Sequence, residues 1–126
     1  MNGYNWVKFE TLIGYVFEKV VHDDHHDAIE FYLSEYDKKP LFILTHIQDC
    51  CELVYIESIV GDLSDLEKSP ILMSELSTNI DDVEQEYEHV TWTFIKFATL
   101  KGYIDIRYYG TSNGYYSESA DLYMLS

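Results

Sequence analysis

Positive charge is scarce in this sequence. Its 126 residues hold 8 Lys and Arg against 23 Asp and Glu, which gives a formal net charge of -15. Affinity for a phosphate backbone comes mainly from clustered basic side chains that displace counterions, so we expect no direct nucleic-acid binding. The same deficit disfavours binding to an acidic membrane surface. The surplus of carboxylates suits solubility, attraction to a basic partner protein, or imitation of a nucleic acid that occupies such a partner.

Long hydrophobic runs, a basic leader and widely spaced cysteines are also missing. No window approaches the roughly 20 consecutive apolar residues of a membrane span, and residues 1–10 lack the basic start and apolar stretch of a signal peptide. We therefore expect a soluble, cytoplasmic protein with no membrane partner. The two cysteines, Cys50 and Cys51, are adjacent. Bridging neighbours demands a strained eight-membered ring, so we expect a reduced thiol pair.

Large apolar side chains, by contrast, are plentiful. Hydrophobic residues make up 47% of the chain, and there are 12 Tyr, 6 Phe and 2 Trp. Disordered acidic chains are poor in aromatics, whereas this content can offset the entropy of ordering a domain of this size. We expect residues 1–126 to form a single domain, without an internal repeat or a linker.

The residue pattern predicts a mainly β domain of the α+β class, with an antiparallel sheet of about six strands and one or two short helices. Helical turns are expected at residues 8–13, ended by Gly14, and at residues 61–67, capped by Asp62 or Ser64. The acidic stretch 79–88 is expected to be a solvated loop. Strand-like runs occupy residues 15–21, 28–36, 41–47, 90–100, 103–109 and 115–124, and residues 53–59 are expected to form a short strand or a turn.

A tight hairpin in the C-terminal third is the most informative of these elements. Lys101-Gly102 has the chemistry of a two-residue turn, and counting outward from it places Lys96 directly across from Arg107. Alternation along the two strands then gives one apolar face for the core and one aromatic, partly cationic face. The apolar face is expected to hold Ile95, Phe97, Ile104, Ile106 and Tyr108. The opposite face is expected to hold Trp92, Phe94, Lys96, Ala98, Tyr103, Asp105, Arg107 and Tyr109.

This second face needs a counter-charge, because like charges directly opposite one another destabilise a strand pair. Residues 91–116 hold three bases and one acid, a local charge of +2, whereas the remaining five bases and 22 acids give -17. Arg107 is the chain's only arginine. One interpretation is an internal salt bridge that folds a carboxylate over Lys96 and Arg107. The candidate carboxylates are Asp105, Asp49, Glu52 and Glu57.

The other interpretation is an anion-binding surface. Arg107 would act as a forked donor and Lys96 as a point charge, beside aromatic side chains on which a base or another ring can stack. The turn at Asn113-Gly114 would add backbone amides beside Arg107. The expected ligand-binding residues are Trp92, Phe94, Lys96, Arg107, Tyr109 and Asn113.

Catalytic and metal sites have weaker support. His46 with Cys50 or Cys51 has the chemistry of a general base and a thiolate nucleophile. No group that would stabilise an oxyanion or orient the histidine follows at a recognisable spacing, so we expect no enzyme. His22, His25 and His26 have metal-ligand chemistry. A hairpin loop seldom holds three imidazoles in tetrahedral geometry, however, so we expect neither a specific metal nor a cofactor.

Four strings of residues carry a family resemblance. They occupy residues 46–57, 61–66, 92–103 and 107–118, and they resemble a domain-of-unknown-function family found in bacteriophages and bacteria. The resemblance extends from Phe9 to Leu122, with departures at Ile95, where an aromatic is usual, and at Tyr108, where Trp is usual. It implies no catalytic role. It implies a phage or mobile-element setting, in which small accessory proteins commonly bind host factors or defence signals.

Two functional hypotheses follow. The first is a non-enzymatic protein that sequesters a small anionic, nucleotide-like ligand on the aromatic and cationic face, to counter host defence. The second is an acidic, nucleic-acid-mimicking inhibitor of a basic host protein such as a nuclease. We also expect a homodimer, because Tyr115, Tyr116 and Tyr123 near a terminal strand suit a shared sheet edge.

Overall fold

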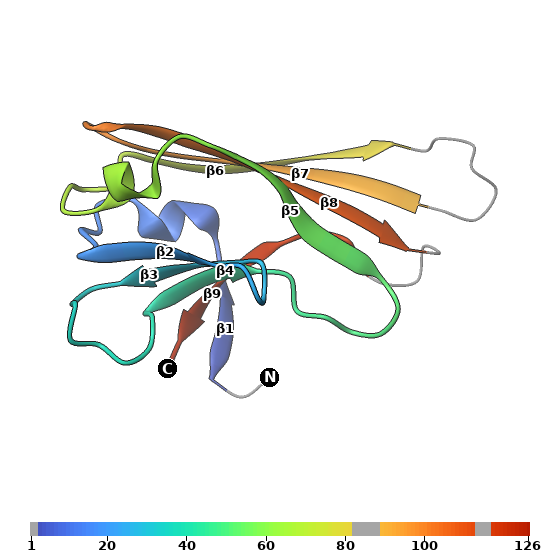
Figure 1. Ribbon diagram of the computed structural model, residues 1–126, viewed down its shortest axis with the longest axis horizontal. Helices are drawn as coiled ribbons and strands as arrows, with labels where there is room; N and C mark the ends of the chain where they lie inside the picture. Colours follow the sequence, from blue (N-terminus) through green and yellow to red (C-terminus); the bar gives the residue numbers. More distant parts are fainter. Residues whose placement is uncertain (1–2, 82–88, 113–116) are drawn as a thin grey trace.

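Two antiparallel sheets stacked face to face make up the protein (Figure 1), seen here in a computed structural model that describes residues 3–81, 89–112 and 117–126. The five-stranded sheet runs in the order β1 (Tyr4–Val7), β9 (Asp121–Leu125), β4 (Phe42–Thr45), β3 (Ala28–Tyr32) and β2 (Lys19–Asp23). The four-stranded sheet runs in the order β5 (Leu53–Val60), β8 (Gly102–Ser112), β7 (His89–Thr99) and β6 (Met73–Asp81).

The mainly β prediction is confirmed, but the α+β class and the single sheet of about six strands are not. The described residues contain nine strands and two 3-10 turns, η1 (Phe9–Leu12) and η2 (Leu63–Leu66), and no α-helix. Both turns lie where helical turns were expected, and Asp62 caps η2 by accepting the Ser64 backbone N–H. Segments this short cannot sustain an α-helix alone, so they fold as single turns that bury one or two apolar side chains. No helix in the described ranges is long and apolar enough to cross a membrane.

The core lies between the sheets and is rich in aromatic rings. Phe31 packs against Phe17 at 5.1 Å and against Phe97 at 5.5 Å between ring centroids, which joins the five-stranded sheet to β7. Tyr108 is fully buried, as expected of the apolar face, and its hydroxyl donates to the Asp27 carbonyl at 2.6 Å. Burial raises the pKa of Tyr108 far above its ordinary range, so this hydroxyl stays a donor.

The β7–β8 hairpin forms, but its register differs from the prediction by two residues. Thr99 pairs with Gly102, so Lys96 lies opposite Asp105 and Arg107 lies opposite Phe94. A two-residue shift leaves every side chain on its predicted face, and the five expected core residues of the two strands are all buried. The predicted opposition of Lys96 and Arg107 is therefore wrong.

Contacts with η2 explain this register. The Thr99 hydroxyl donates to the Asp65 carbonyl and accepts the Lys101 backbone N–H, and Lys101 Nζ donates to the Glu67 carbonyl at 2.7 Å. A Cβ on Gly102 would lie 2.8 Å from an Asp65 carboxylate oxygen. Gly102 is thus a strand residue that allows η2 to approach closely, and the turn falls on Leu100 and Lys101.

The ends of the chain also differ from expectation. The last strand begins at Asp121 rather than at residue 115, and β9 lies between β1 and β4. Tyr123 therefore does not lie on a free sheet edge, contrary to expectation; the homodimer stays a prediction. Tyr115 and Tyr116 fall outside the described residues. Of the stretch expected to be a loop, residues 79–81 belong to β6, and residues 82–88 are outside the described ranges.

Candidate functional site

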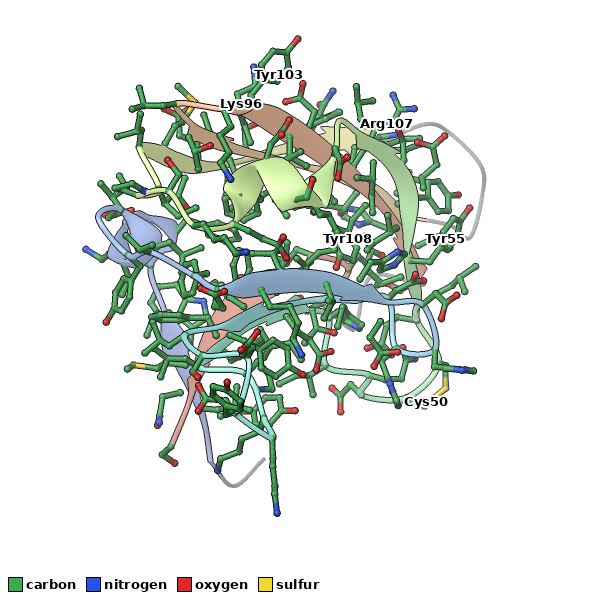
Figure 2. All side chains as sticks on the ribbon, turned by 60° about the vertical axis from the view of Figure 1, so that its left-hand side comes forward. Cys50, Tyr55, Lys96, Tyr103, Arg107 and Tyr108 are labelled. Atoms are coloured by element: carbon green, nitrogen blue, oxygen red, sulfur yellow. A yellow bond between two sulfur atoms is a disulfide. The ribbon has the colours of Figure 1, made fainter. Side chains whose placement is uncertain are left out.

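The candidate site lies on the outer face of the four-stranded sheet, the face turned away from the five-stranded sheet. Figure 2 shows Lys96, Tyr103 and Arg107 on this outer side, whereas Tyr108 points between the sheets. The side chains form rows across the strands, because residues that pair in register share a face. One row is Glu75, Lys96 and Asp105; the next is Ser77, Phe94, Arg107 and Ser58; the third is Asn79, Trp92, Tyr109 and Tyr55.

A groove of about 480 Å³ occupies the middle of the outer face. Three of the predicted ligand-binding residues, Phe94, Lys96 and Arg107, line it, and the Phe94 side chain is 39% exposed. Trp92 and Tyr109 lie in the adjoining row rather than in the lining. Asn113 falls outside the described residues. The remaining lining residues are Ser58, Val60, Glu75, Leu76, Ser77, Ile95, Asp105 and Ile106.

Both groove cations have partners among the candidate carboxylates, Asp105 and Glu57, but they form two separate ion pairs rather than one carboxylate folded over both cations. Lys96 Nζ lies 3.7 Å from Asp105 Oδ1, and Arg107 Nε donates to Glu57 Oε2 at 2.5 Å. Glu57 is the extra residue of a β-bulge, since Ile56 pairs with Tyr108 and Ser58 with Arg107. A bulge can redirect a side chain in this way. These pairs are half-exposed, so they contribute little stability.

Aromatic rings border the guanidinium group. The Arg107 guanidinium carbon is 5.3 Å from the Trp92 ring centroid, and Trp92 and Tyr109 meet edge to face at 5.0 Å. Tyr109 in turn contacts Tyr55 at 5.5 Å. Among the hydrogen bonds of the described residues, Arg107 uses only Nε, which leaves the donors on its two terminal nitrogens for a ligand. The site thus offers a forked donor, a second cation and the Phe94 ring in the groove, with further ring surfaces in the adjoining row.

Arg107→Ala should lower the free energy of unfolding by less than about 1 kcal/mol, because the ion pair with Glu57 is exposed to solvent. Part of that loss would come from the contact with Trp92. Urea unfolding of the variant and wild type measures it. A loss above about 3 kcal/mol would mean that Arg107 is a buried structural group instead.

A second polar cluster lies in the loop before β5, where sequence reasoning saw only separate candidates. The Glu52 side chain is fully buried and accepts from His46 Nε2 at 2.8 Å. It also accepts the backbone N–H groups of Asp49 at 2.9 Å and Cys50 at 2.8 Å. Burial alone would raise the pKa of Glu52, but the Cys50 and Asp49 N–H groups and His46 lower it from 4.5 to about 2. Glu52 therefore pairs with His46 rather than with Lys96 or Arg107 of the groove.

A third cluster surrounds Glu118, which is also buried. Its carboxylate accepts from His89 Nδ1 at 2.6 Å, from the Thr91 hydroxyl at 2.7 Å and from the Ser112 hydroxyl. Burial would raise the pKa of Glu118, yet these donors, Ser112 first, lower it. The neighbouring Ser119 carbonyl accepts from His46 Nδ1 at 2.9 Å, so the segment 117–120 joins the two histidine–glutamate pairs. No sequence spacing signalled this meeting of distant residues.

The cysteines and histidines of the sequence analysis are placed differently from expectation. Cys50 and Cys51 form a disulfide, which corrects the predicted reduced pair. His46 directs its ring nitrogens at Glu52 and the Ser119 carbonyl, so neither is aimed at a cysteine as a base would be. His26 contacts Asp23. Within the described ranges, no group of three or more His, Cys, Asp or Glu side chains is placed to hold a metal ion.

Comparison with known proteins gives a family and no function. No curated protein and no solved structure matches the chain. One family model matches residues 7–122, which span both sheets and the groove. The chain therefore belongs to the family of the domain of unknown function DUF7448.

Proposed function

We propose that this protein is a non-enzymatic binding protein that sequesters a small anionic, nucleotide-like ligand in the groove of its outer face. The observation that carries the proposal is the groove itself, in which Phe94, Lys96 and Arg107 lie side by side. The unused terminal donors of Arg107 suit a phosphate group, and the exposed Phe94 ring suits stacking of a base.

The carboxylates in the groove are compatible with such a ligand. Glu57 engages only the Nε–H of Arg107, so a phosphate can bind the terminal nitrogens while this contact holds the guanidinium in place. Glu75 and Asp105 lie at the other side of the groove and can accept hydrogen bonds from the N–H groups of a base. A nucleotide carries both features, an anionic group and a ring with donors.

Isothermal titration against a panel of cyclic and linear nucleotides tests the proposal. We expect saturable heat for at least one nucleotide, and a loss of about 1.5 to 3 kcal/mol of binding free energy in Arg107→Ala, roughly tenfold to hundredfold in Kd. Lys96→Gln should also weaken binding. Lys68→Gln is the matched control, because Lys68 has a carboxylate partner, Glu18, at the same 3.7 Å but lies outside the groove lining. If no nucleotide gives a measurable heat of binding, the proposal is refuted.

The alternative function, an acidic inhibitor of a basic protein such as a nuclease, is favoured by a different observation. Lys96 and Arg107 are each paired with a carboxylate, which reduces the positive field of the face on a chain of net charge -15. Titration of purified basic nucleases at low and high salt separates the two functions. An electrostatic complex should weaken steeply over a few hundred millimolar salt, since screening acts over about 10 Å at 0.1 M.

The proposed setting follows from the marker strings rather than from the fold. The strings at residues 46–57 and 107–118 resemble those of phage and bacterial proteins, so we propose a phage or mobile-element accessory protein. It would act in the host cytoplasm. Counter-defence is the role that unites this setting with ligand sequestration.

A further inference from the structure

Cys50 and Cys51 lie in a surface loop outside the proposed binding groove. Their sulfur atoms are bonded to each other, both residues are exposed, and Figure 2 shows Cys50 at the edge of the molecule. They are the only cysteines of the chain. Any exchange of this disulfide must therefore occur with a thiol from outside the protein.

This disulfide has little to contribute to folding. A cross-link stabilises a protein mainly by restricting the unfolded chain, and the effect grows with the length of the loop that it closes. Neighbouring residues enclose no loop. The bond can therefore open and close while the two sheets remain folded.

The backbone beside this bond is tied to the buried Glu52 cluster. Cys50 donates its N–H to Glu52 Oε1 at 2.8 Å, and its carbonyl accepts from Gln48 Nε2 at 3.3 Å. The same Gln48 nitrogen donates to the Glu52 carbonyl at 2.6 Å, and Glu52 binds His46. Opening the bond frees the dihedral angles of both cysteines, and the hydrogen bonds of Cys50 with Glu52 and Gln48 give a route by which this change reaches His46.

We propose that Cys50 and Cys51 form a reversible thiol–disulfide centre, which reacts with external thiols and whose oxidation state sets the conformation of residues 46–52. In reduction, an external thiolate attacks one cysteine sulfur, the Cys50–Cys51 bond breaks, and a mixed disulfide and a cysteine thiolate form. A second external thiolate then displaces the remaining cysteine. Two thiols become one external disulfide, two electrons pass to the protein, and each cysteine sulfur takes up a proton.

The local charge selects among thiols. Asp49 and Glu52 flank the cysteine pair, and the whole chain has a net charge of -15. A negative field raises the local concentration of cations and repels anions. The centre should therefore react faster with a cationic thiol than with an anionic one.

Thiol exchange followed by alkylation tests this proposal. The native protein is treated with cysteamine, 2-mercaptoethanol or glutathione at equal thiolate concentration and is then alkylated, and the alkyl groups are counted by mass spectrometry. We expect two alkyl groups per chain in each case, with cysteamine at least about tenfold faster than glutathione at low salt and a smaller ratio at high salt. The His46 ring resonances should shift on reduction and return on reoxidation with oxidised glutathione. In Cys51→Ser, which has no disulfide, these resonances should not respond to thiols.

Three results would overturn the proposal. Alkylation that requires denaturant would show that external thiols cannot reach the disulfide in the folded protein. Reduction without any shift of the His46 resonances would show that the oxidation state of the cysteine pair does not set the conformation of residues 46–52. Equal rates for the three thiols at low salt would refute the electrostatic selection. Cys50→Ser repeats the control in case Cys51→Ser does not fold.

Discussion

Gly110→Ala should lower the free energy of unfolding by about 3 kcal/mol or more, the upper range for forcing an atom into a packed interior. A Cβ at this position of β8 would lie 2.0 Å from the Glu118 carbonyl oxygen and 2.9 Å from its carbonyl carbon. Both are backbone atoms, so relief requires the segment 117–120 to move away. That movement would also break the hydrogen bonds between Glu118 and His89 and between Ser119 and His46. Urea unfolding measures the loss.

Thr111→Ala is the matched control for this prediction. Thr111 is the next residue of β8, and its buried hydroxyl has no hydrogen-bond partner in the part of the chain that the structure describes. Its removal should cost less than about 1 kcal/mol, because no hydrogen bond is lost. Equal losses for the two variants would contradict the close contact between Gly110 and Glu118.

Glu52→Ala should cost about 3 kcal/mol or more, because it leaves the buried His46 side chain and two loop N–H groups without their shared acceptor. Thermal and urea unfolding at pH 7 measure this loss. Glu35→Ala is the control, since Glu35 is an exposed residue of the loop after β3. A loss no larger than that of Glu35→Ala would mean that Glu52 does not hold the loop.

The same carboxylate should make stability depend on acid pH. The pKa of Glu52 is lowered in the folded protein, from 4.5 to about 2, so the folded state binds its proton less readily than the unfolded chain. Its contribution to stability is fully present above pH 4.5 and is lost as the pH falls toward 2. Glu52→Gln should lose this part of the pH dependence in unfolding experiments between those values. An unchanged profile would contradict the lowered pKa.

The sequence was sufficient to predict which face of the sheet each side chain of β7 and β8 occupies, but not which residues pair across the two strands. Alternation in β7 and β8 depends only on period two, so Ile95 and Ile106 were correctly assigned to the core. The residue opposite Arg107 depends on where the turn between β7 and β8 falls. The position of that turn depends on contacts of Thr99 and Gly102 with η2, which lies more than 30 residues away in the chain. Local turn chemistry at Lys101-Gly102 carries no information about that contact.

Other features depend wholly on tertiary contacts. β6 lacks a clear alternation of apolar and polar residues because it is an exposed edge strand, so no strand was predicted for Met73–Asp81. Glu57 is directed toward Arg107 by a bulge, and a bulge leaves no reliable mark in a single sequence. His89 begins β7 and Glu118 follows β8, so the two residues of this pair are 29 positions apart in the sequence.

The most direct test of the binding groove is the fluorescence of Trp92, which touches Arg107 beside the groove. Trp6, the other tryptophan, is exposed on β1 and is removed as Trp6→Phe so that Trp92 alone reports. We predict a saturable fluorescence change with at least one nucleotide, lost in Arg107→Ala and retained in Lys68→Gln. No saturable change with any nucleotide, in a variant that melts like the wild type, would contradict binding at this face.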